Sequence, residues 1–151
     1  MTVMTTRKLF SGLCFAALMA TAGVHAATQD PKPLDTGRNH PLERTQLLTT
    51  GSCDRCDLSE EDFTGKDLKG ASLAGANLTG ATFYKAVVTN GNFGDADLTK
   101  ALLQYADLTN ANFGGAKLDG ANLTGAKGAN LVGAVTTANT TCPDGQSGPC
   151  R

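Results

Sequence analysis

The residues of this chain that are best suited to chemistry are its cysteines. Thiols form disulfides, bind zinc or exchange with other thiols, depending on their spacing and surroundings. Cys14 lies in an apolar N-terminal run, and the other four cysteines lie at positions 53, 56, 142 and 150. An even number of cysteines indicates disulfides in an exported chain. Two sharper alternatives are a four-cysteine zinc site and a redox motif made by residues 53–56, which read Cys-Asp-Arg-Cys.

Other side chains offer little support for catalysis. His40 is the only histidine left once the N-terminal run is removed, and the chain has no phosphate-binding glycine motif and no helical metal-binding motif. Four acidic residues, Asp57, Glu60, Glu61 and Asp62, lie close together in the sequence. We interpret them as a solvated end of the fold rather than as a metal or catalytic site. The sequence therefore predicts a protein that is not an enzyme and that binds no cofactor or metal.

A tandem array separates the two pairs of cysteines. From residue 56 to residue 125 the sequence repeats every five residues, fourteen times, without an insertion. The first place of each repeat is alanine from Ala71 to Ala121, apart from Gly91, and the outer places are mostly polar residues or glycine. The third, central place is always large and apolar: Leu58, Phe63, Leu68, Leu73, Leu78, Phe83, Val88, Phe93, Leu98, Leu103, Leu108, Phe113, Leu118 and Leu123.

A period of five excludes both regular secondary structures. In a helix, residues five apart diverge by roughly 140°, so the apolar residues would form no continuous stripe. In a straight strand, residues five apart point to opposite faces. All central residues can be buried together only if the backbone bends once per repeat. A chain that bends in this way is a solenoid.

These repeats resemble the pentapeptide-repeat family, whose consensus is Ala-(Asp/Asn)-Leu-X-X. Matching segments include residues 76–78, 96–98, 106–108, 111–113 and 121–123. The resemblance implies an all-β fold, a right-handed quadrilateral β-helix of about four coils, with four repeats per coil and with the central and alanine side chains pointing inward. Residues twenty apart would then stack, which pairs Phe63 with Phe83 and Phe93 with Phe113.

The segment before the array predicts export and a cap. Arg7 and Lys8 precede an apolar run, and small residues up to Ala26 suit a signal peptidase, so residues 1–26 are interpreted as a signal peptide. A retained membrane anchor is the alternative, although the run is short for a membrane span. The expected location is periplasmic or secreted, in a bacterium, after cleavage near Ala26. Removing this segment leaves a net charge of about −3, which is no basic surface for nucleic acid.

The rest of the chain divides around the array. Residues 27–40 form a flexible lead-in, and residues 41–55 form an N-terminal cap with a short helix from Pro41 to Thr50, ended by Gly51. We expect Leu42, Leu47 and Leu48 of this helix to cover the open end of the β-helix. The β-helix takes residues 56–135, and residues 136–151 form a C-terminal tail with a cysteine pair.

The two ends of the array depart from the family pattern. Cys56, Glu61 and Lys66 stand where alanine is expected, so either the first coil is more open or these side chains turn outward. Near the other end, Gly128 cannot fill a central place, and the phase slips by three residues. We expect an irregular last coil there.

Val132 and Val135 are predicted to close that last coil. The position of the cysteines at opposite ends of the array favours local pairing, Cys53 with Cys56 and Cys142 with Cys150, among the three connectivities that four cysteines allow.

One outer patch is unusually apolar. Tyr84, Lys85, Val87, Leu102 and Tyr105 fall at outward places, on adjoining sides of neighbouring coils, and include both tyrosines of the chain. Interfaces favour tyrosine and clustered apolar surface, although scattered apolar residues on a surface need no explanation. We call this set the tyrosine patch and interpret it as a candidate protein-binding site.

The sequence thus predicts a non-enzymatic periplasmic or secreted repeat scaffold or protein-binding module. Its partner is expected to be a protein, with no nucleic acid bound and no membrane span after cleavage, and it is expected to be a monomer or an end-to-end dimer. One alternative is the gyrase-protecting, DNA-mimicking branch of the family, which the signal peptide and the mild charge disfavour. The other is an envelope thiol-disulfide or metal protein that uses Cys53 and Cys56.

Overall fold

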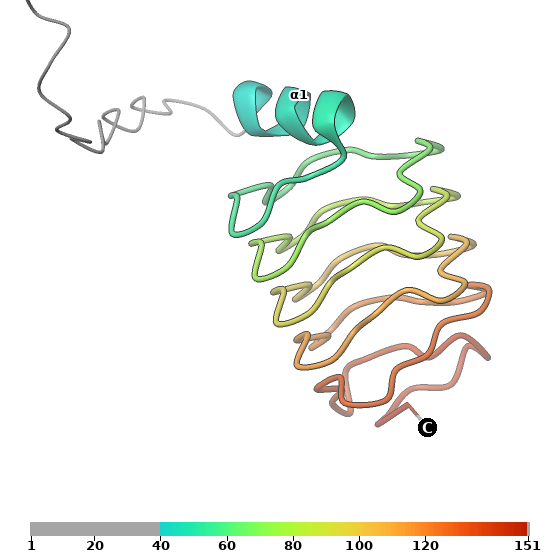
Figure 1. Ribbon diagram of the computed structural model, residues 1–151. Helices are drawn as coiled ribbons and strands as arrows, with labels where there is room; N and C mark the ends of the chain where they lie inside the picture. Colours follow the sequence, from blue (N-terminus) through green and yellow to red (C-terminus); the bar gives the residue numbers. More distant parts are fainter. Residues whose placement is uncertain (1–39, 151) are drawn as a thin grey trace, which may run out of the picture. The chain divides into compact units, whose positions relative to one another are not determined.

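The computed structural model describes residues 40–150, which form one compact unit. The predicted signal peptide and the lead-in before His40 lie outside the described residues. Within residues 40–150 there is one helix, α1 (Pro41–Thr50), and after it the chain winds into stacked coils (Figure 1). This described part of the chain contains no helix that is long and apolar enough to cross a bilayer.

Parallel bridges hold each coil to the next one. They join the second place of a repeat to the residue twenty positions further on, from Ser52↔Ser72 to Asp107↔Lys127. At the first of them, the Ser72 N–H donates to the Gly51 carbonyl at 2.8 Å. Each bridge is isolated, so the described sides of the coils are too short to form extended strands. The expected stacking of residues twenty apart is confirmed.

The backbone bends at the last two places of every repeat. The N–H of the following first place closes the bend by donating to the central carbonyl, as from Ala76 to Leu73 at 3.1 Å. The fifth place has a positive φ, a conformation that glycine adopts without steric cost. Eight fifth places hold this conformation without glycine: Arg55, Glu60, Lys85, Asn90, Asp95, Lys100, Tyr105 and Asn110.

Five of the side chains at fifth places lie over glycines of the next coil, whereas Lys85 and Asn90 are followed one coil later by Tyr105 and Asn110. A Cβ atom placed on Gly75 would stand 3.3 Å from Arg55 Cγ, and one on Gly120 would stand 3.4 Å from Lys100 Cγ. Fifth places that are twenty residues apart form a column on the outside of the coils. In these five cases the larger side chain covers the backbone of the glycine one coil further on.

The central places fill the interior. All fourteen of the predicted central residues are buried, and Leu68, the most accessible of them, is 5% exposed. The rings of Phe63 and Phe83 stack with centroids 5.0 Å apart, and those of Phe93 and Phe113 stack at 4.9 Å. Both predicted pairs of stacked rings are therefore confirmed.

Gly91 interrupts the run of inward alanines for a local reason. A Cβ atom at Gly91 would come within 2.8 Å of Val88 Cγ1 and 3.0 Å of the Val88 carbonyl oxygen. Val88 is the only β-branched residue at the fourteen central places, and its second methyl branch takes the space that alanine uses in the other repeats.

The bridged array begins one repeat before the predicted start at residue 56. Ser52 bridges Ser72, and Cys53 takes the central place, where it is fully buried. The three unusual first places that follow behave differently from one another: Cys56 is half-buried against the core, Glu61 is 3% exposed, and Lys66 is exposed. The first coil therefore keeps Glu61 inside and turns only Lys66 outward.

Helix α1 has the predicted bounds but buries fewer residues than expected. Pro41 occupies its first turn, and Gly51 ends it in the left-handed conformation, donating its N–H to the Leu47 carbonyl at 2.9 Å. Leu47 is 1% exposed and joins the core. The expectation for Leu42 and Leu48 was wrong, because they are 70% and 45% exposed. In the described chain α1 therefore meets the core through a single leucine.

The coil spacing shortens after Gly128. The bridge Lys117↔Val135 spans eighteen residues and Asn122↔Thr141 spans nineteen, in place of the regular twenty. The bridges thus continue beyond residue 135 into the predicted tail. The phase slip of three is seen in Leu131, which packs against the core as a central residue would.

The valines do not close this end. Val132 is 82% exposed and Val135 is 54% exposed, so the expectation that they cover the last coil was wrong. The shortened spacing puts Val135 at a bridging place, which faces outward. The buried residue here is Thr140, which is fully enclosed and donates its hydroxyl to the Leu118 carbonyl at 2.7 Å.

Candidate functional site

The tyrosine patch is built on the outer turns of two successive coils. Tyr84 stands at the fourth place of its repeat, and Tyr105 stands at the fifth place one coil further on. Their rings meet edge to face, with centroids 5.8 Å apart and planes at 89°. Lys85 Nζ lies 5.1 Å from the centroid of the Tyr84 ring, within cation–π range. An edge-to-face pair of this kind contributes about 0.5–1.5 kcal/mol beyond the area it buries, and it fixes the two rings against each other.

The other two members of the patch lie at bridging places. Leu102 bridges Thr82, two residues before Tyr84, so it shares a side of the solenoid with the rings, and it is 40% exposed. Val87 bridges Asp107 on the next side and is only half-buried. The structure therefore brings Tyr84, Lys85 and Tyr105 into contact, places Leu102 on the same side, and puts Val87 around the corner.

Two further residues shape this surface, and neither was included in the predicted patch. Gln104 follows Tyr84 by twenty residues and directly precedes Tyr105. Its Oε1 atom is buried and has no hydrogen-bond partner. Gly125 lies beneath the Tyr105 ring, where any Cβ atom would stand 2.7 Å from Cδ1. The spacing of twenty between Tyr105 and Gly125 is the signal that could have revealed this contact.

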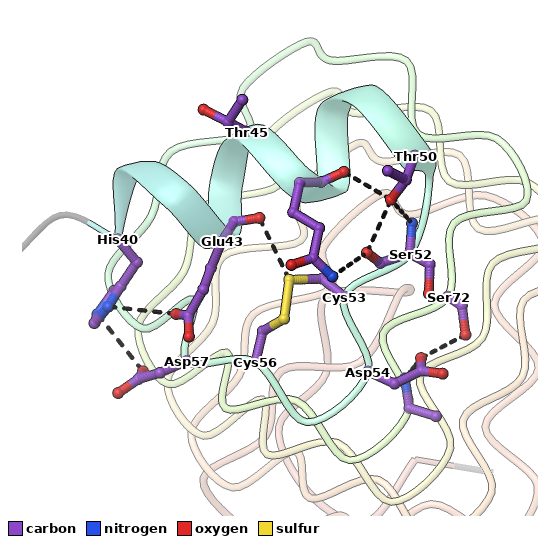
Figure 2. Close-up of a disulfide and its surroundings, with 12 residues drawn as sticks. His40, Glu43, Thr45, Thr50, Ser52, Cys53, Asp54, Cys56, Asp57 and Ser72 are labelled. Atoms are coloured by element: carbon purple, nitrogen blue, oxygen red, sulfur yellow. Dashed lines mark hydrogen bonds and ion pairs between the residues drawn. A yellow bond between two sulfur atoms is a disulfide. The ribbon is translucent and has the colours of Figure 1, made fainter. Parts of the chain in front are cut away.

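The N-terminal cysteines form a disulfide beneath α1 (Figure 2). Cys53 belongs to the hydrophobic core, and the half-buried Cys56 packs against it. The Glu43 carbonyl oxygen of α1 lies 3.3 Å from Cys53 Sγ, so the helix backbone covers that sulfur. The pairing is the local one that the sequence favoured. Mass mapping of alkylated peptides is the experiment that tests it.

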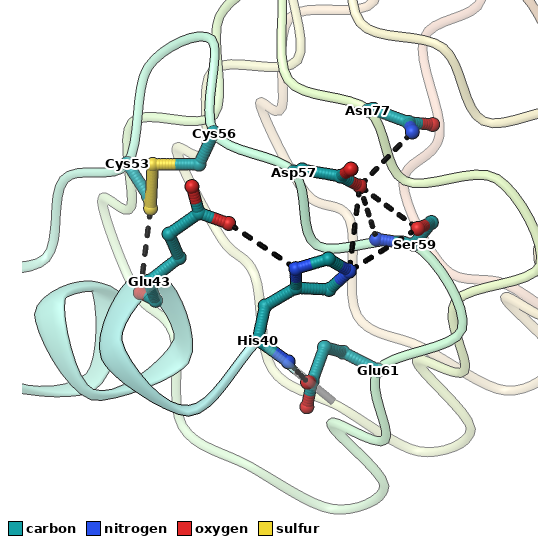
Figure 3. A network of polar contacts seen from close by, with 8 residues as sticks. All are labelled: His40, Glu43, Cys53, Cys56, Asp57, Ser59, Glu61 and Asn77. Carbon is teal, nitrogen blue, oxygen red and sulfur yellow. Dashed lines mark hydrogen bonds and ion pairs between the residues drawn. A yellow bond between two sulfur atoms is a disulfide. The ribbon is translucent and has the colours of Figure 1, made fainter. Parts of the chain in front are cut away.

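A polar network surrounds His40 at the start of α1 (Figure 3). The imidazole Nδ1 lies 3.6 Å from Glu43 Oε2, and Nε2 lies 3.6 Å from Asp57 Oδ1 and 3.5 Å from the Ser59 hydroxyl. The same Asp57 oxygen accepts hydrogen bonds from Ser59 and from the Asn77 side chain at 3.0 Å. Each group therefore has partners within the protein, and the network holds α1 against the first two coils.

Glu61 is the buried member of the acidic cluster. Its Oε1 accepts the His40 backbone N–H at 2.6 Å, and its Oε2 lies 3.5 Å from Arg44 Nε. The interpretation of the cluster as a solvated end was therefore wrong for Glu61, which fixes the first turn of α1. Within residues 40–150, no group of three or more histidine, cysteine or acidic residues is arranged to hold a metal ion.

The C-terminal disulfide joins Cys142 to Cys150 and also has the locally favoured pairing. Cys142 is 8% exposed and Cys150 is half-buried, and neither belongs to the core cluster. An open depression of about 490 Å³ lies over this bond, and both cysteines line it together with Pro143, Asp144 and Pro149.

The aspartates along the coils have structural rather than catalytic surroundings. The Thr99 hydroxyl, as a hydrogen-bond donor, lowers the pKa of the Asp97 carboxyl below its usual value, and the Thr99 backbone N–H adds to this effect. The same motif, with a threonine two residues later, lowers the pKa of Asp62 and Asp107. These carboxylates stay ionised at neutral pH, which suits a turn-forming acceptor and not a proton donor.

The model of the family "Pentapeptide repeats" matches this chain in eight copies, over residues 52–90 and 92–127. These segments coincide with the bridged part of the coils, which begins at Ser52 and keeps its regular spacing as far as Lys127. The chain belongs to the pentapeptide-repeat family. Members of this family form right-handed β-helices. Comparison with the curated proteins gives no match.

Solved pentapeptide-repeat proteins are similar to this one. One from the cyanobacterium Cyanothece 51142 is 22% identical, covering 62% of this chain and 89% of that one, with a TM-score of 0.38. One from the thylakoid lumen of Arabidopsis thaliana is 33% identical, covering 61% and 70%, with a TM-score of 0.27. QnrB1, described as a plasmid-mediated fluoroquinolone resistance protein, is 23% identical, covering 58% of this chain and 53% of QnrB1, with a TM-score of 0.34.

Within a pentapeptide-repeat protein, function is best sought where side chains do something other than build the coil. The inward places of this chain are taken up by the core, and the outward aspartates and asparagines mostly close turns. What remains is the tyrosine patch and the two disulfide-bearing ends.

Proposed function

We propose that this pentapeptide-repeat protein is a non-enzymatic scaffold that binds a partner protein through the tyrosine patch. The scaffold is a right-handed quadrilateral β-helix of about four coils, and α1 is its N-terminal cap. The protein is exported to the periplasm or secreted, after cleavage near Ala26, and acts as a monomer or an end-to-end dimer.

The contacts between α1 and the first coil support the cap. A solenoid end exposes unpaired backbone groups and apolar side chains, which need a cover. The Gln46 amide donates to the Ser52 carbonyl at 3.1 Å, and the Thr50 hydroxyl accepts the Ser52 N–H at 3.2 Å. Leu47 covers the interior beside them. The first coil thus has polar and apolar partners on its open side.

The observation that carries the binding proposal is the fixed pair of rings, in which Tyr84 is half-buried and Tyr105 is exposed. Tyr105 is 54% exposed although its ring is fixed against both Tyr84 and Gly125. A side chain that is already ordered loses little conformational entropy when a partner covers it. Tyrosine is also enriched at protein interfaces, because it offers apolar area with a polar tip. Lys85 and Gln104 supply polar groups beside the rings.

The test compares how much partner protein is captured by the unaltered protein and by a variant whose tyrosine patch is altered. Tyr84→Thr and Tyr105→Asn are the suitable changes, because other fourth places carry threonine and because asparagine already holds the left-handed fifth place at Asn90 and Asn110. We expect the double variant to keep its thermal unfolding midpoint and to lose more than about 90% of specific capture from envelope extract, as hot-spot aromatic residues do.

A matched control keeps the test specific. Thr89→Ser with Lys100→Asn alters a fourth and a fifth place outside the patch, with the same backbone conformation at the fifth. This control should capture the partner as the unaltered protein does. Undiminished capture by the tyrosine variant would remove the patch from the proposal, whereas recovery of full-length protein in the cytoplasm alone would remove the export.

A further inference from the structure

The two disulfides differ in what covers them and in what holds their cysteines. Cys53 occupies an inward, central place with its sulfur under the Glu43 carbonyl of α1, and Cys56 packs against the core. Both are also fixed by the coil: the Cys53 N–H donates to the Ser72 carbonyl at 2.8 Å, and the Cys56 carbonyl accepts from the next coil at 2.9 Å. If this bond were reduced, the two thiols would stay side by side.

Within residues 40–150, the C-terminal bond is not covered by a helix, and its cysteines are held by local contacts instead: the Cys142 N–H donates to the Gln146 carbonyl at 2.8 Å. The Cys150 N–H donates to the Thr136 hydroxyl at 3.2 Å. Cys142 and Cys150 lie outside the core cluster and line the open depression of about 490 Å³. That space gives an incoming thiolate room to approach a sulfur, which exchange requires.

We propose that Cys142–Cys150 is a thiol–disulfide exchange site whose reaction partner is a dithiol. This inference is independent of the tyrosine patch. The proposed exchange site lies at the other end of the array from Cys53-Asp54-Arg55-Cys56, which is the redox motif that the sequence offered as an alternative.

The exchange proceeds in two balanced steps. A thiolate of the dithiol attacks Cys150 Sγ, a mixed disulfide forms, the Cys142–Cys150 bond breaks, and Cys142 leaves as a thiolate that takes up a proton. The second thiol of the dithiol then loses its proton and attacks the mixed disulfide at the partner's sulfur. Cys150 is released as a thiol, and the dithiol is oxidised to its disulfide by two electrons. Cys150 is the attacked sulfur because it is the more exposed one of the pair.

The surroundings also accommodate the reduced form. The Gly148 carbonyl oxygen lies 3.5 Å from Cys142 Sγ and 3.7 Å from Cys150 Sγ, so it can accept a weak S–H hydrogen bond from a released thiol. Residues 140–148 form a hairpin that does not depend on the disulfide. Its two arms are joined by the antiparallel bridge Thr141↔Ser147 and by the Gly148 N–H, which donates to the Thr140 carbonyl at 3.0 Å. Reduction therefore separates Cys150 from Cys142 without opening the coils.

The test uses timed reduction of the oxidised full chain with dithiothreitol, followed by alkylation and tryptic mass mapping. Trypsin cleaves after Arg55 and so separates Cys53 from Cys56, whereas Cys142 and Cys150 stay in one peptide. We expect the C-terminal pair to be alkylated at a rate on the order of ten times that of the N-terminal pair, because exchange follows sulfur access. Glutathione alone should leave its adduct on Cys150.

Two controls separate access from intrinsic reactivity. In guanidinium chloride the two pairs should be reduced at similar rates, because unfolding exposes both. The variant Leu47→Ala, which weakens the hold of α1, should speed reduction of Cys53–Cys56 alone. Equal rates in the folded protein, or faster reduction of the N-terminal pair, would overturn the proposal, as would an adduct found on Cys142.

Discussion

The two ends of this solenoid are finished in different ways. At the N-terminal end a separate helix lies over the first coil, one leucine enters the core, and the disulfide is buried beneath the helix. At the C-terminal end the coil itself changes its spacing, a threonine takes the buried place, and the disulfide stays outside the core. The first end is closed by adding an element and the second by distorting the repeat, so we expect them to respond to different perturbations.

The largest expected effect is at Leu47. Leu47→Ala removes the one α1 side chain that enters the core, and it should lower the free energy of unfolding by about 2–4 kcal/mol, measured by chemical denaturation. Leu48→Ala on the same helix and Val132→Ala at the other end alter exposed residues and should each change it by less than about 0.5 kcal/mol. A loss at Leu47 no larger than at Leu48 would mean that α1 is not anchored as described.

An intermediate effect is expected at Glu61, where consensus and structure disagree. Glu61→Ala restores the alanine typical of the first place, yet it leaves the His40 N–H without its acceptor and Arg44 without its partner. We expect a loss of about 1–3 kcal/mol and faster hydrogen exchange at the His40 amide.

Lys66→Ala is the matched control, because it restores the same consensus residue at an exposed first place. This change should leave the free energy of unfolding within about 0.5 kcal/mol of the unaltered protein. If Glu61→Ala and Lys66→Ala lowered the free energy of unfolding equally, or if neither lowered it, the anchoring role of Glu61 would be contradicted.

The smallest effect concerns acid and the C-terminal end. The Thr137 hydroxyl and the Asn139 amide lower the pKa of Asp119 below its usual value of 3.8. A depressed pKa means that the ionised form stabilises the fold, so the stabilisation is present above pH 3.8 and is lost as the pH falls through the lower folded pKa. The protection factor of the Asn139 backbone amide, which is its exchange rate relative to the intrinsic rate at the same pH, should therefore fall at acid pH.

Asp119→Asn should abolish most of that pH dependence at Asn139, because the amide does not titrate. The amides of α1 should respond to acid as before. Unchanged acid sensitivity at Asn139 in this variant would show that another group controls the C-terminal end.

The regular part of the fold could be predicted from the sequence because the period of five leaves the backbone few choices. The burial of the central places follows from that constraint, whereas the spacing of twenty and the pairing of Phe63 with Phe83 follow from the four repeats per coil that the family resemblance implies. Cys53 could also have been placed, since it precedes Leu58 by five residues, but its repeat begins with Gly51 rather than alanine and so hides the pattern.

The ends could not be predicted in the same way because they depend on contacts between elements. Leu47 and Leu48 are adjacent and chemically identical, and only the seating of α1 on the first coil decides which one is buried. Val135 became a bridging residue because the spacing fell to eighteen, and Gly128 signals such a slip without giving its size. The tyrosine patch was located by its spacing, and the spacing of twenty between Tyr105 and Gly125 could have revealed their contact as well.

The columns of fifth places bear on which segments of this array can be duplicated. Two of them alternate strictly between a side chain and glycine: Arg55, Gly75, Asp95, Gly115 in one, and Glu60, Gly80, Lys100, Gly120 in the other. Duplicating one coil of twenty residues would set two side chains, or two glycines, above one another in both columns. The unit that can be copied without changing the alternation in these two columns is two coils, or forty residues.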